Sequence, residues 1–335
     1  MTYQEFIKEW SDNNPFFTAH TSGSTGIPKE IQISREVAIE SAKRTIVYFQ
    51  INENTRLHSC ISPDFIGGKM MAVRAALADA NLSWEPPSNH PVLITVDNHG
   101  NRIVPDFVAV VPSQMLGIIE LLNSQSLSAE EKSKVRSNTV FLCGGAPVND
   151  NLAARIIKEN LRVFESYGMT ETCSHIALRR VGEDFFTPLD SITVTTDKRQ
   201  CLVIEVPHLN PIVTNDIALL NTDGSFRILG RYDNVIISGG KKIFPEEIEK
   251  ILLPVLSPYD VTDIMAFGRK DNLWGEILCI DIECDKVTDN VNIIEICRNL
   301  AASLLPSWQR PKQIRIVSRL PRTPNGKLDR KMSAK

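Results

Sequence analysis

The order of strand-like and helix-like segments along the first 160 residues constrains the fold of this chain more than any other feature. The sequence predicts a short strand at residues 57–61 and further strands at the mainly apolar runs 92–96, 107–111 and 139–143. Helical spacing of apolar residues occurs at 34–49, with Ser34 as a suitable N-cap, and at 70–80, 113–122 and 149–159. Because strands that alternate with helices form parallel sheets with right-handed crossovers, the sequence predicts an α/β domain.

The pattern changes near residue 190, where short alternating strands replace the helices. Strands are predicted at 192–196, 202–206 and 217–220, with a turn at Asp223-Gly224. After residue 232 the predicted elements are strands at 235–238, 264–267, 277–282 and 313–317, and helices from Pro245 and over 291–304. We therefore predict a large N-terminal α/β domain, residues 1–231, with a β-rich part near its end, and a small C-terminal α+β domain, residues 232–335.

Charge and cysteine content exclude several classes of protein. The net charge of −3 gives no global attraction to nucleic acid or to acidic lipid. The longest apolar stretches are strand-sized, and the polar N-terminal residues do not resemble a signal peptide, so we expect a cytoplasmic protein without a membrane partner. The seven cysteines are scattered and form no CxxC pair, so the sequence predicts neither a disulfide framework nor a zinc site.

A string rich in serine, threonine and glycine follows His20 and ends with a lysine. Glycines let backbone amides turn towards an anion, hydroxyl groups add hydrogen-bond donors, and the lysine adds positive charge. This composition suits a triphosphate, although the spacing is not that of a Walker A loop. The candidate phosphate-binding residues are Thr21, Ser22, Gly23, Ser24, Thr25, Gly26 and Lys29.

This string resembles the phosphate loop of the adenylate-forming superfamily, which contains acyl-CoA synthetases, peptide-synthetase adenylation domains and luciferases. Further segments resemble the other motifs of that family, in the family's order. They are Cys143-Gly144-Gly145-Ala146-Pro147, Tyr167-Gly168-Met169-Thr170-Glu171-Thr172, Asn215-Asp216, Gly230-Arg231-Tyr232-Asp233-Asn234, residues 238–249 and Pro324-Asn325-Gly326-Lys327. The resemblance covers residues 20–330, and it implies an enzyme that uses ATP and Mg²⁺ to form an acyl-adenylate.

The resemblance also implies roles for individual residues in binding the nucleotide. The residues expected around the base and the sugar are Gly144, Gly145, Ala146, Pro147, Tyr167, Gly168, Met169, Asp216 and Arg231. Tyr167 offers a flat face for adenine, and Asp216 with Arg231 can hydrogen-bond the ribose hydroxyls. Thr170 and Glu171 are expected to be catalytic, with Glu171 as an oxygen ligand for Mg²⁺.

The C-terminal domain is expected to be mobile and to serve both steps of the reaction. Lys327, in a tight turn, is the expected catalytic cation, because it can bridge the α-phosphate and the attacking carboxylate. Asp233 is the expected hinge, and Ser238, Gly239 and Gly240 are expected to line a tunnel for coenzyme A (CoA). ATP should bind between the two domains.

The chain departs from the family pattern at its N-terminus and at two motif positions. Only about twenty residues precede the phosphate loop, where family members have well over a hundred, so the N-terminal domain is expected to lack a subdomain. A homodimer is one way to cover the truncated part. Glu30 and Asn215 each replace a glycine of the family motifs, and neither change removes a catalytic group.

Two segments indicate the acid that is activated. Residues 62–74 and 170–176 resemble the o-succinylbenzoate–CoA ligases of menaquinone biosynthesis, whose substrate is a small aromatic acid with two carboxylates. Lys69, Ser174 and His175 are the expected substrate-binding residues, with Lys69 rather than Arg74 facing the acid. Free CoA is the expected acceptor, giving o-succinylbenzoyl-CoA, AMP and pyrophosphate.

Two alternatives remain open at this point. The first is another enzyme of the same superfamily, either a different aryl- or acyl-CoA ligase or a stand-alone adenylation domain that loads a carrier protein. The second is a non-catalytic nucleotide-binding protein that retains the fold. Release of pyrophosphate on addition of ATP and an acid distinguishes an enzyme from a binding protein.

Overall fold

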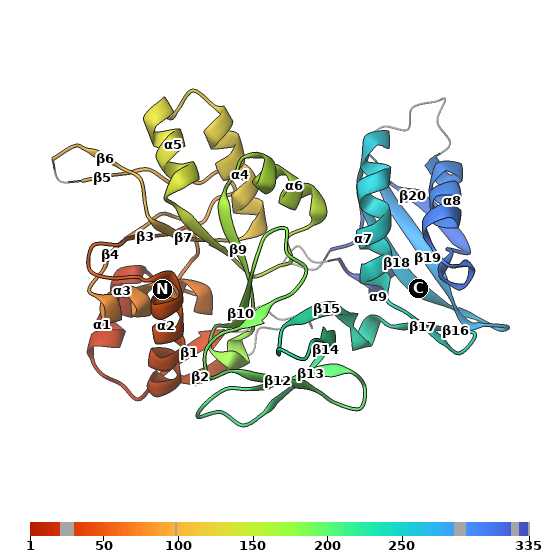
Figure 1. The fold of residues 1–335 in the computed structure, drawn as a ribbon, viewed down its shortest axis with the longest axis horizontal. Coiled ribbons are helices and arrows are strands. Elements are labelled where there is room, and N and C mark those ends of the chain that lie inside the picture. Colours follow the sequence, from red (N-terminus) through yellow and green to blue (C-terminus); the bar gives the residue numbers. More distant parts are fainter. Residues whose placement is uncertain (21–29, 98, 285–292, 323–327, 334–335) are drawn as a thin grey trace. The chain divides into compact units, whose positions relative to one another are not determined.

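A computed structural model describes residues 1–20, 30–97, 99–284, 293–322 and 328–333 (Figure 1). The chain forms two compact units. The first contains residues 1–194, 204–212 and 221–226, and the second contains residues 195–203, 213–220 and 227–335. The prediction that a mobile domain begins at residue 232 stays a prediction.

A seven-stranded sheet forms the centre of the first unit, with strand order β11-β10-β9-β8-β7-β3-β4. Its strands are β3 (Arg56–Ser59), β4 (Asn81–Trp84), β7 (Phe107–Val110), β8 (Val140–Cys143), β9 (Arg162–Gly168), β10 (His175–Arg180) and β11 (Thr187–Pro188). Strands β3, β4, β7, β8 and β9 are parallel, and β10 and β11 add an antiparallel edge. The predicted α/β class is therefore confirmed.

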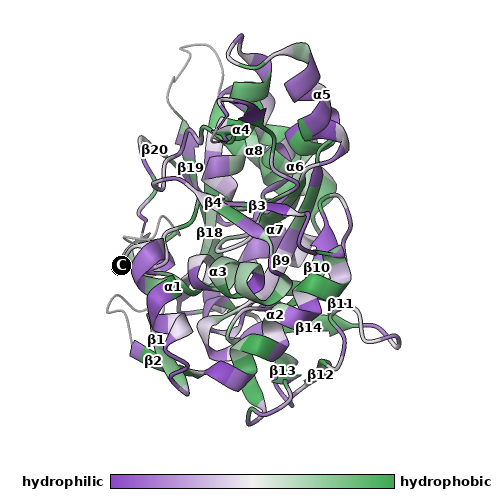
Figure 2. Cartoon of the chain, turned by 90° about the vertical axis from the view of Figure 1, so that its left-hand side faces the viewer, coloured by the Kyte–Doolittle hydropathy of each residue, from purple (hydrophilic) through white to green (hydrophobic). Residues whose placement is uncertain are grey.

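Helices flank this sheet and bury their apolar residues against it. They are α1 (Tyr3–Ser11), α2 (Arg35–Phe49), α3 (Ile66–Ala78), α4 (Pro112–Asn123), α5 (Ala129–Ser137) and α6 (Asp150–Lys158). Ser34 caps α2 as predicted, because its side chain accepts a hydrogen bond from the Val37 amide. Helix α5 is mostly hydrophilic in Figure 2 and buries only Val135, whereas every residue of strands β7 and β8 is buried.

The N-terminal segments form a second apolar cluster in the first unit. Helix α1 contributes Tyr3, Phe6 and Trp10, which pack with residues of α2 and α3. Strands β1 (Phe16–His20) and β2 (Glu30–Ser34) pair antiparallel, from Phe16 opposite Ser34 to His20 opposite Glu30. The cluster therefore covers the side of α3 that the sheet leaves open.

One predicted strand was wrong. Residues 92–96 do not join the parallel sheet: only β5 (Thr95–Val96) is extended, and it pairs with β6 (Arg102–Ile103). The amides of Val92 and Leu93 donate to the Glu85 carboxylate instead of to a neighbouring strand, and Leu93 has φ +63°. The position beside β3 is taken by β4, which the sequence pattern did not predict because its residues are half-buried or exposed.

The β-rich region forms a four-stranded sheet of order β12-β13-β14-β15. Its strands are β12 (Thr193–Thr196), β13 (Cys201–Glu205), β14 (Ile212–Leu220) and β15 (Phe226–Arg231). The predicted turn at Asp223-Gly224 joins the last two strands, and Gly224 has φ +83° there.

The remainder of the second unit is an α+β structure. Its strands are β16 (Ile236–Ser238), β17 (Lys241–Ile243), β18 (Val261–Asp271), β19 (Gly275–Cys284) and β20 (Gln313–Val317). Its helices are α7 (Pro245–Leu256), α8 (Ile293–Leu304) and the short α9 (Arg330–Ser333). Strand β20 pairs parallel to β19, and the apolar faces of α7 and α8 pack on this sheet.

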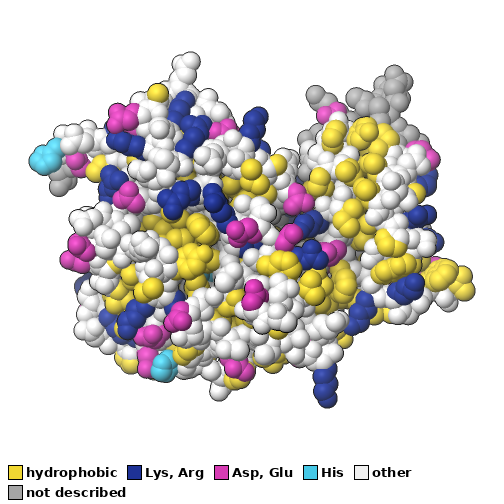
Figure 3. All heavy atoms as spheres, viewed as in Figure 1, with side chains coloured by type: hydrophobic (Ala, Val, Ile, Leu, Met, Phe, Trp, Pro, Cys, Tyr) yellow, Lys and Arg dark blue, Asp and Glu magenta, His cyan; other side chains and the backbone are white. Residues whose placement is uncertain are grey.

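The surface is of mixed charge. Positive and negative side chains are interspersed on the face shown in Figure 3. Within the described residues, no helix has the length and apolar character that crossing a membrane requires. All seven cysteines are free thiols and all are buried.

Candidate active site

The carboxyl ends of two neighbouring strands carry two of the motif segments. Strand β8 ends at Cys143 and is followed by residues 144–147, and the parallel strand β9 ends with Tyr167 and Gly168. A Cβ atom on Gly144 would lie 2.6 Å from Ser166 Oγ, so glycine allows this turn to approach β9 closely. Both segments therefore leave the sheet at the edge where α/β proteins bind ligands.

Glu165 fixes the turn after β8, and the sequence patterns did not single it out. Its side chain is buried, accepts a hydrogen bond from the Val148 amide at 3.2 Å, and pairs with Arg179 Nη2 at 2.6 Å. The carboxylate thus ties residue 148 to β9 and β10. The sequence did contain a signal for this role, namely a glutamate among the apolar residues of a central strand, because buried carboxylates are rare unless they are paired.

Tyr167 belongs to a small aromatic group. Its ring centroid lies 5.3 Å from that of Phe226 in an edge-to-face arrangement and 5.8 Å from that of Phe186. Tyr167 is only half-buried, and residues 145–147 are exposed. The first unit therefore presents a supported aromatic ring beside an exposed turn, which can accommodate a planar base.

The segment after β9 makes a tight turn that exposes a carboxylate. Thr172 Oγ1 donates to Ser174 O at 2.6 Å, and Cys173 has φ +66°, a conformation that costs energy for a residue with a Cβ atom. A Cβ on Gly168 would lie 2.4 Å from Ser174 O, so the turn also requires glycine there. Thr170 is buried, whereas Glu171 is exposed and available as a hard oxygen ligand for Mg²⁺.

Arg74 is buried without an anionic partner among the described residues. Its side chain is 1% exposed, its Nη2 donates to Ser174 Oγ at 3.0 Å, and its Nε makes no hydrogen bond. Burial lowers the pKa of Arg74 to about 10, so the guanidinium still carries its charge at neutral pH. A buried cation that lacks an anion is costly, and an anionic ligand at this position would offset that cost.

Ser174 and His175 extend this polar group to α2. Ser174 Oγ lies 3.3 Å from His175 Nδ1, and His175 Nε2 lies 3.2 Å from Thr45 Oγ1. Burial, with a smaller contribution from Arg74, lowers the pKa of His175 well below its usual value. The imidazole is therefore neutral, and Arg74 is the one charged side chain of the Arg74–Ser174–His175 group.

Lys69 has different neighbours from Arg74, although both lie on α3. Its Nζ contacts Met1 Sδ at 2.9 Å and lies 4.5 Å from the centroid of the Phe6 ring, on the side covered by α1. The glycines before it also have a packing role: a Cβ on Gly68 would lie 2.3 Å from Ser62 O. Of the two cations, Arg74 is the one in contact with the predicted substrate residue Ser174.

The expected ribose and hinge residues meet in the second unit. Arg231 Nη1 donates to Asp216 Oδ1 at 3.0 Å, and Arg231 Nη2 donates to Asp233 Oδ2 at 3.1 Å. Asn215 Nδ2 lies 3.4 Å from both oxygens of Asp233. Asp233 is therefore tied to β14 and β15.

The expected CoA-tunnel residues lie at the turn between β16 and β17. Ser238 ends β16, and Gly239 and Gly240 have φ +55° and +77°. The Gly239 amide donates to Trp274 O at 2.9 Å, which fixes the turn against the start of β19. Among the described residues other than its two chain neighbours, none lies within 4 Å of a Cβ built on Gly240, whereas a Cβ on Gly239 would lie 2.9 Å from the Trp274 ring.

Two predicted sites lie outside the described residues. They are the phosphate-loop residues Thr21, Ser22, Gly23, Ser24, Thr25, Gly26 and Lys29, and the catalytic lysine Lys327. The residues on either side of both segments are described. His20 pairs with Glu30 at the end of the β1–β2 hairpin, and Arg322 forms a β-bridge with Leu328.

The chain on either side of residues 323–327 is anchored by two ion pairs. Before this segment, Arg322 pairs with Asp263 on β18. After it, Arg330 Nη2 donates to both oxygens of Glu249 on α7, at 2.7 and 2.6 Å, and Arg330 Nε donates to Ala266 O at 3.0 Å. The Asp329 amide also donates to Pro321 O at 2.8 Å. These contacts hold both ends of the lysine segment to the second unit.

Comparison with protein families gives two matches that together span most of the chain. Residues 4–216 match the AMP-binding enzyme family, and residues 247–327 match the AMP-binding enzyme C-terminal domain.

Individual relatives agree with these matches. The 2-succinylbenzoate–CoA ligase of Listeria monocytogenes serotype 4b is 25% identical over 97% of this chain and 70% of its own length. An acyl-CoA synthetase (AMP-forming)/AMP-acid ligase II-like protein from Dyadobacter fermentans is 30% identical, with TM-score 0.61, over 98% of this chain and 91% of its own. The o-succinylbenzoate CoA synthetase of Bacillus subtilis, solved with an acyl-adenylate, shares the fold at 22% identity and TM-score 0.77, over 95% of this chain and 68% of its own.

Proposed function

Because the chain belongs to the AMP-binding enzyme family, in which a carboxylic acid is activated as an acyl-adenylate, we propose that it is an acid–CoA ligase for o-succinylbenzoate. The reaction consumes ATP, o-succinylbenzoate and CoA and yields o-succinylbenzoyl-CoA, AMP and pyrophosphate. Menaquinone biosynthesis is the pathway in which this product is used. The similarity to the Listeria and Bacillus ligases supports this choice of acid.

The observation that carries the choice of acid is the buried guanidinium of Arg74, which has no anionic partner among the described residues. o-Succinylbenzoate has two carboxylates, and only the one on the succinyl chain is consumed by adenylation. The carboxylate on the ring stays ionised in both steps and needs a cation if it is buried. Arg74, with Ser174 beside it, supplies that cation, whereas Lys69 is occupied against Phe6 and Met1. We therefore assign to Arg74 the role that the sequence suggested for Lys69.

The remaining residues have the following proposed roles in the first step. Tyr167 and residues 144–147 hold the adenine, and Asp216 with Arg231 binds the ribose. Glu171 is an exposed carboxylate suited to Mg²⁺, which bridges phosphate oxygens and neutralises their charge. Lys327 stabilises the negative charge that develops as the carboxylate attacks the α-phosphate.

In the second step, the CoA thiol attacks the carbonyl carbon of the acyl-adenylate. AMP leaves with the bonding electron pair, and the thiol proton is lost to solvent. In this proposal the Gly239–Gly240 turn lies beside the pantetheine chain, and the space beside Gly240 is free of contacts with the described residues. A rotation of the C-terminal domain about Asp233 between the two steps would move Lys327 away from the acyl group and bring the Gly239–Gly240 turn towards it.

Pyrophosphate release with two acids that differ in one carboxylate tests the proposal. o-Succinylbenzoate is compared with 3-benzoylpropionate, which has the same keto acid chain and lacks the ring carboxylate. The native chain should prefer o-succinylbenzoate in kcat/KM by about 10²- to 10³-fold, the value of one buried ion pair. Arg74→Met should abolish this preference, and the matched variant Lys69→Met should retain it.

Three results would decide against parts of the proposal. Preference retained in Arg74→Met and lost in Lys69→Met would return the role to Lys69. Equal use of both acids by the native chain would favour another aryl- or acyl-CoA ligase. No pyrophosphate release with any acid of a broad panel would indicate a non-catalytic nucleotide-binding protein.

A further inference from the structure

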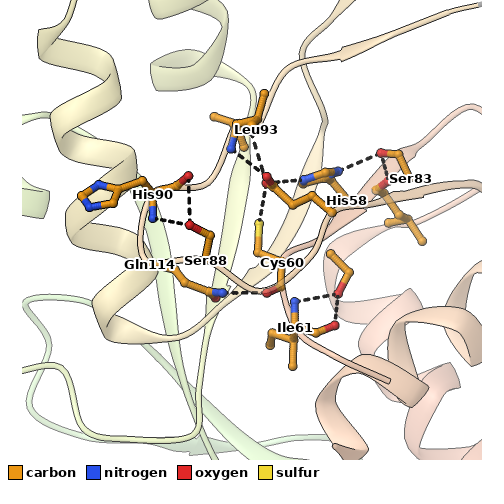
Figure 4. A network of polar contacts seen from close by, with 12 residues as sticks. His58, Cys60, Ile61, Ser83, Ser88, His90, Leu93 and Gln114 are labelled. Carbon is orange, nitrogen blue, oxygen red and sulfur yellow. Dashed lines mark hydrogen bonds and ion pairs between the residues drawn. The ribbon is translucent and has the colours of Figure 1, made fainter. Parts of the chain in front are cut away.

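Three side chains of different chemistry meet at the carboxyl ends of β3 and β4, in the first unit. His58 lies in β3, Cys60 follows that strand, and Glu85 follows β4 (Figure 4). His58 Nε2 lies 3.0 Å from Glu85 Oε1, and Cys60 Sγ lies 3.3 Å from the same oxygen. His58 and Cys60 are fully buried, and the Glu85 side chain is 13% exposed.

The surrounding hydrogen bonds orient each of these groups. Ser83 Oγ donates its proton to Leu57 O at 3.1 Å. The same oxygen therefore acts as the acceptor in its 2.9 Å contact with His58 Nδ1, which carries the proton. That contact leaves Nε2 facing Glu85. In metal sites, a histidine ligand is held in the same way, by a hydrogen bond from its second ring nitrogen.

The Glu85 carboxylate is likewise anchored. Its Oε2 accepts from the Val92 amide at 2.8 Å, and its Oε1 accepts from the Leu93 amide at 3.3 Å. The cluster is therefore rigid before any ion binds, which limits the ordering that binding requires. None of these residues has a role in the proposed adenylation chemistry.

We propose that His58, Cys60 and Glu85 form a Zn²⁺ site. The three ligand atoms all lie within 4.8 Å of one another, and imidazole, thiolate and carboxylate are the ligands that Zn²⁺ uses in proteins. Tetrahedral geometry with ordinary zinc–ligand bonds places nitrogen and oxygen about 3.3 Å apart, and sulfur and oxygen about 3.5 Å apart. The observed separations of 3.0 and 3.3 Å need to widen by a few tenths of an ångström, and the separation of Nε2 from Sγ, at most 4.8 Å, has to become about 3.5 Å.

A metal ion here would bind Nε2 of His58 and the thiolate of Cys60, so it would displace the thiol proton that Cys60 Sγ now donates to Glu85 Oε1. Three protein ligands leave a fourth position for water, and the bound ion would join the segment after β3 to residues 85–93.

Cobalt substitution tests the site directly. The full chain, treated with chelator and free of ATP and Mg²⁺, is titrated with Co²⁺ and followed by absorption. One equivalent should produce the visible bands of tetrahedral Co²⁺ and a thiolate-to-cobalt charge-transfer band, and one equivalent of Zn²⁺ should remove both. Cys60→Ser should lose the charge-transfer band, and His58→Gln should weaken binding by more than 100-fold.

Two further variants keep the test independent of folding defects at the buried cluster. Ser83→Ala leaves all three ligands in place, removes the hydrogen bonds of Ser83 Oγ to His58 Nδ1 and Leu57 O, and should weaken Co²⁺ binding by about 10- to 100-fold. His208→Gln removes an exposed histidine elsewhere and should bind as the native chain does. Absence of a charge-transfer band in the native chain at saturating Co²⁺, or its persistence in Cys60→Ser, would overturn the proposal.

Discussion

The Arg330–Glu249 ion pair allows a test of whether the segment that carries Lys327 must be held in place for adenylation. Arg330 bonds both oxygens of Glu249 and also Ala266 O, and each side chain is about one-sixth exposed, at 16% and 15%. Burial raises the pKa of Glu249, and the Arg330 guanidinium opposes that rise. Arg330→Met removes the cation and leaves the carboxyl group buried.

The expected loss of stability follows from these contacts. Breaking a buried ion pair by removing one partner costs about 3–5 kcal/mol. The Ala266 amide still donates to Glu249, and the carboxyl can take up a proton, so we expect the lower figure of about 3 kcal/mol. Arg330→Met/Glu249→Leu also removes the Glu249 carboxyl and leaves only the partly exposed Glu246 carboxylate nearby, so the loss should be below about 1.5 kcal/mol. Urea unfolding of the single and the double variant measures both losses of stability.

Activity separates positioning from stability. If Arg330 positions the Lys327 segment, adenylation should fall about 10- to 100-fold in both variants, because a misplaced catalytic group costs about that much. Thioester formation from preformed acyl-adenylate should change little. Pyrophosphate release and single-turnover thioester assays measure the two steps. Arg298→Met, which removes an exposed arginine paired with Glu295, should alter neither stability nor rate.

Two results would refute this reasoning. If the double variant recovers adenylation along with stability, Arg330 acts only on folding. If both half-reactions fall equally, the segment serves both steps and Lys327 is not specific to the first.

Three further predictions concern single residues. Lys327→Ala should lower adenylation by about 10²- to 10³-fold and leave thioester formation from preformed acyl-adenylate largely intact, and equal losses in both assays would contradict the assignment. Asp233→Pro fixes φ and should keep adenylation but lose thioester formation. Asp233→Ala also breaks the contact with Arg231 but leaves φ free, so it should keep both steps. Identical behaviour of the two variants would place the hinge elsewhere. For His175, burial and then Arg74 lower the pKa, so below pH 6.5 the unfolded chain binds a proton that the folded chain does not. Stability should fall with falling pH by up to about 1.4 kcal/mol per unit, and His175→Gln should lack this component in urea unfolding at pH 7 and pH 5.5.

The elements predicted correctly are those whose signal is local. The strands at 107–111 and 139–143 consist almost entirely of apolar residues, and β7 and β8 are buried at every position. Strand β4 lies at the sheet edge, where packing does not demand apolar residues. Residues 92–96 have the apolar pattern of a strand, but the amides of residues 92 and 93 donate to the Glu85 carboxylate instead of to a neighbouring strand. A local sequence pattern cannot reveal this contact.

In the candidate site, too, local sequence patterns were predictive and contacts between distant residues were not. Tyr167, Gly168 and Glu171 belong to one short string, so the sequence could group them, although their roles in catalysis stay predictions. The contact between Arg74 and Ser174 joins residues that are 100 positions apart. Choosing between Lys69 and Arg74 depended on which side of α3 the first helix covers. The approach of His58, Cys60 and Glu85 likewise depends on the pairing of β3 with β4.

The burial of every native thiol makes the chain suitable for fluorescence labelling. All seven cysteines are 5% exposed or less, so maleimide dyes should not reach them while the fold is intact. A cysteine introduced at an exposed position in each unit, for example at Lys43 and at Arg298, would then be the preferred target. Energy transfer between a donor and an acceptor at those positions could test the proposed rearrangement around Asp233 in single molecules, without removal of a native cysteine.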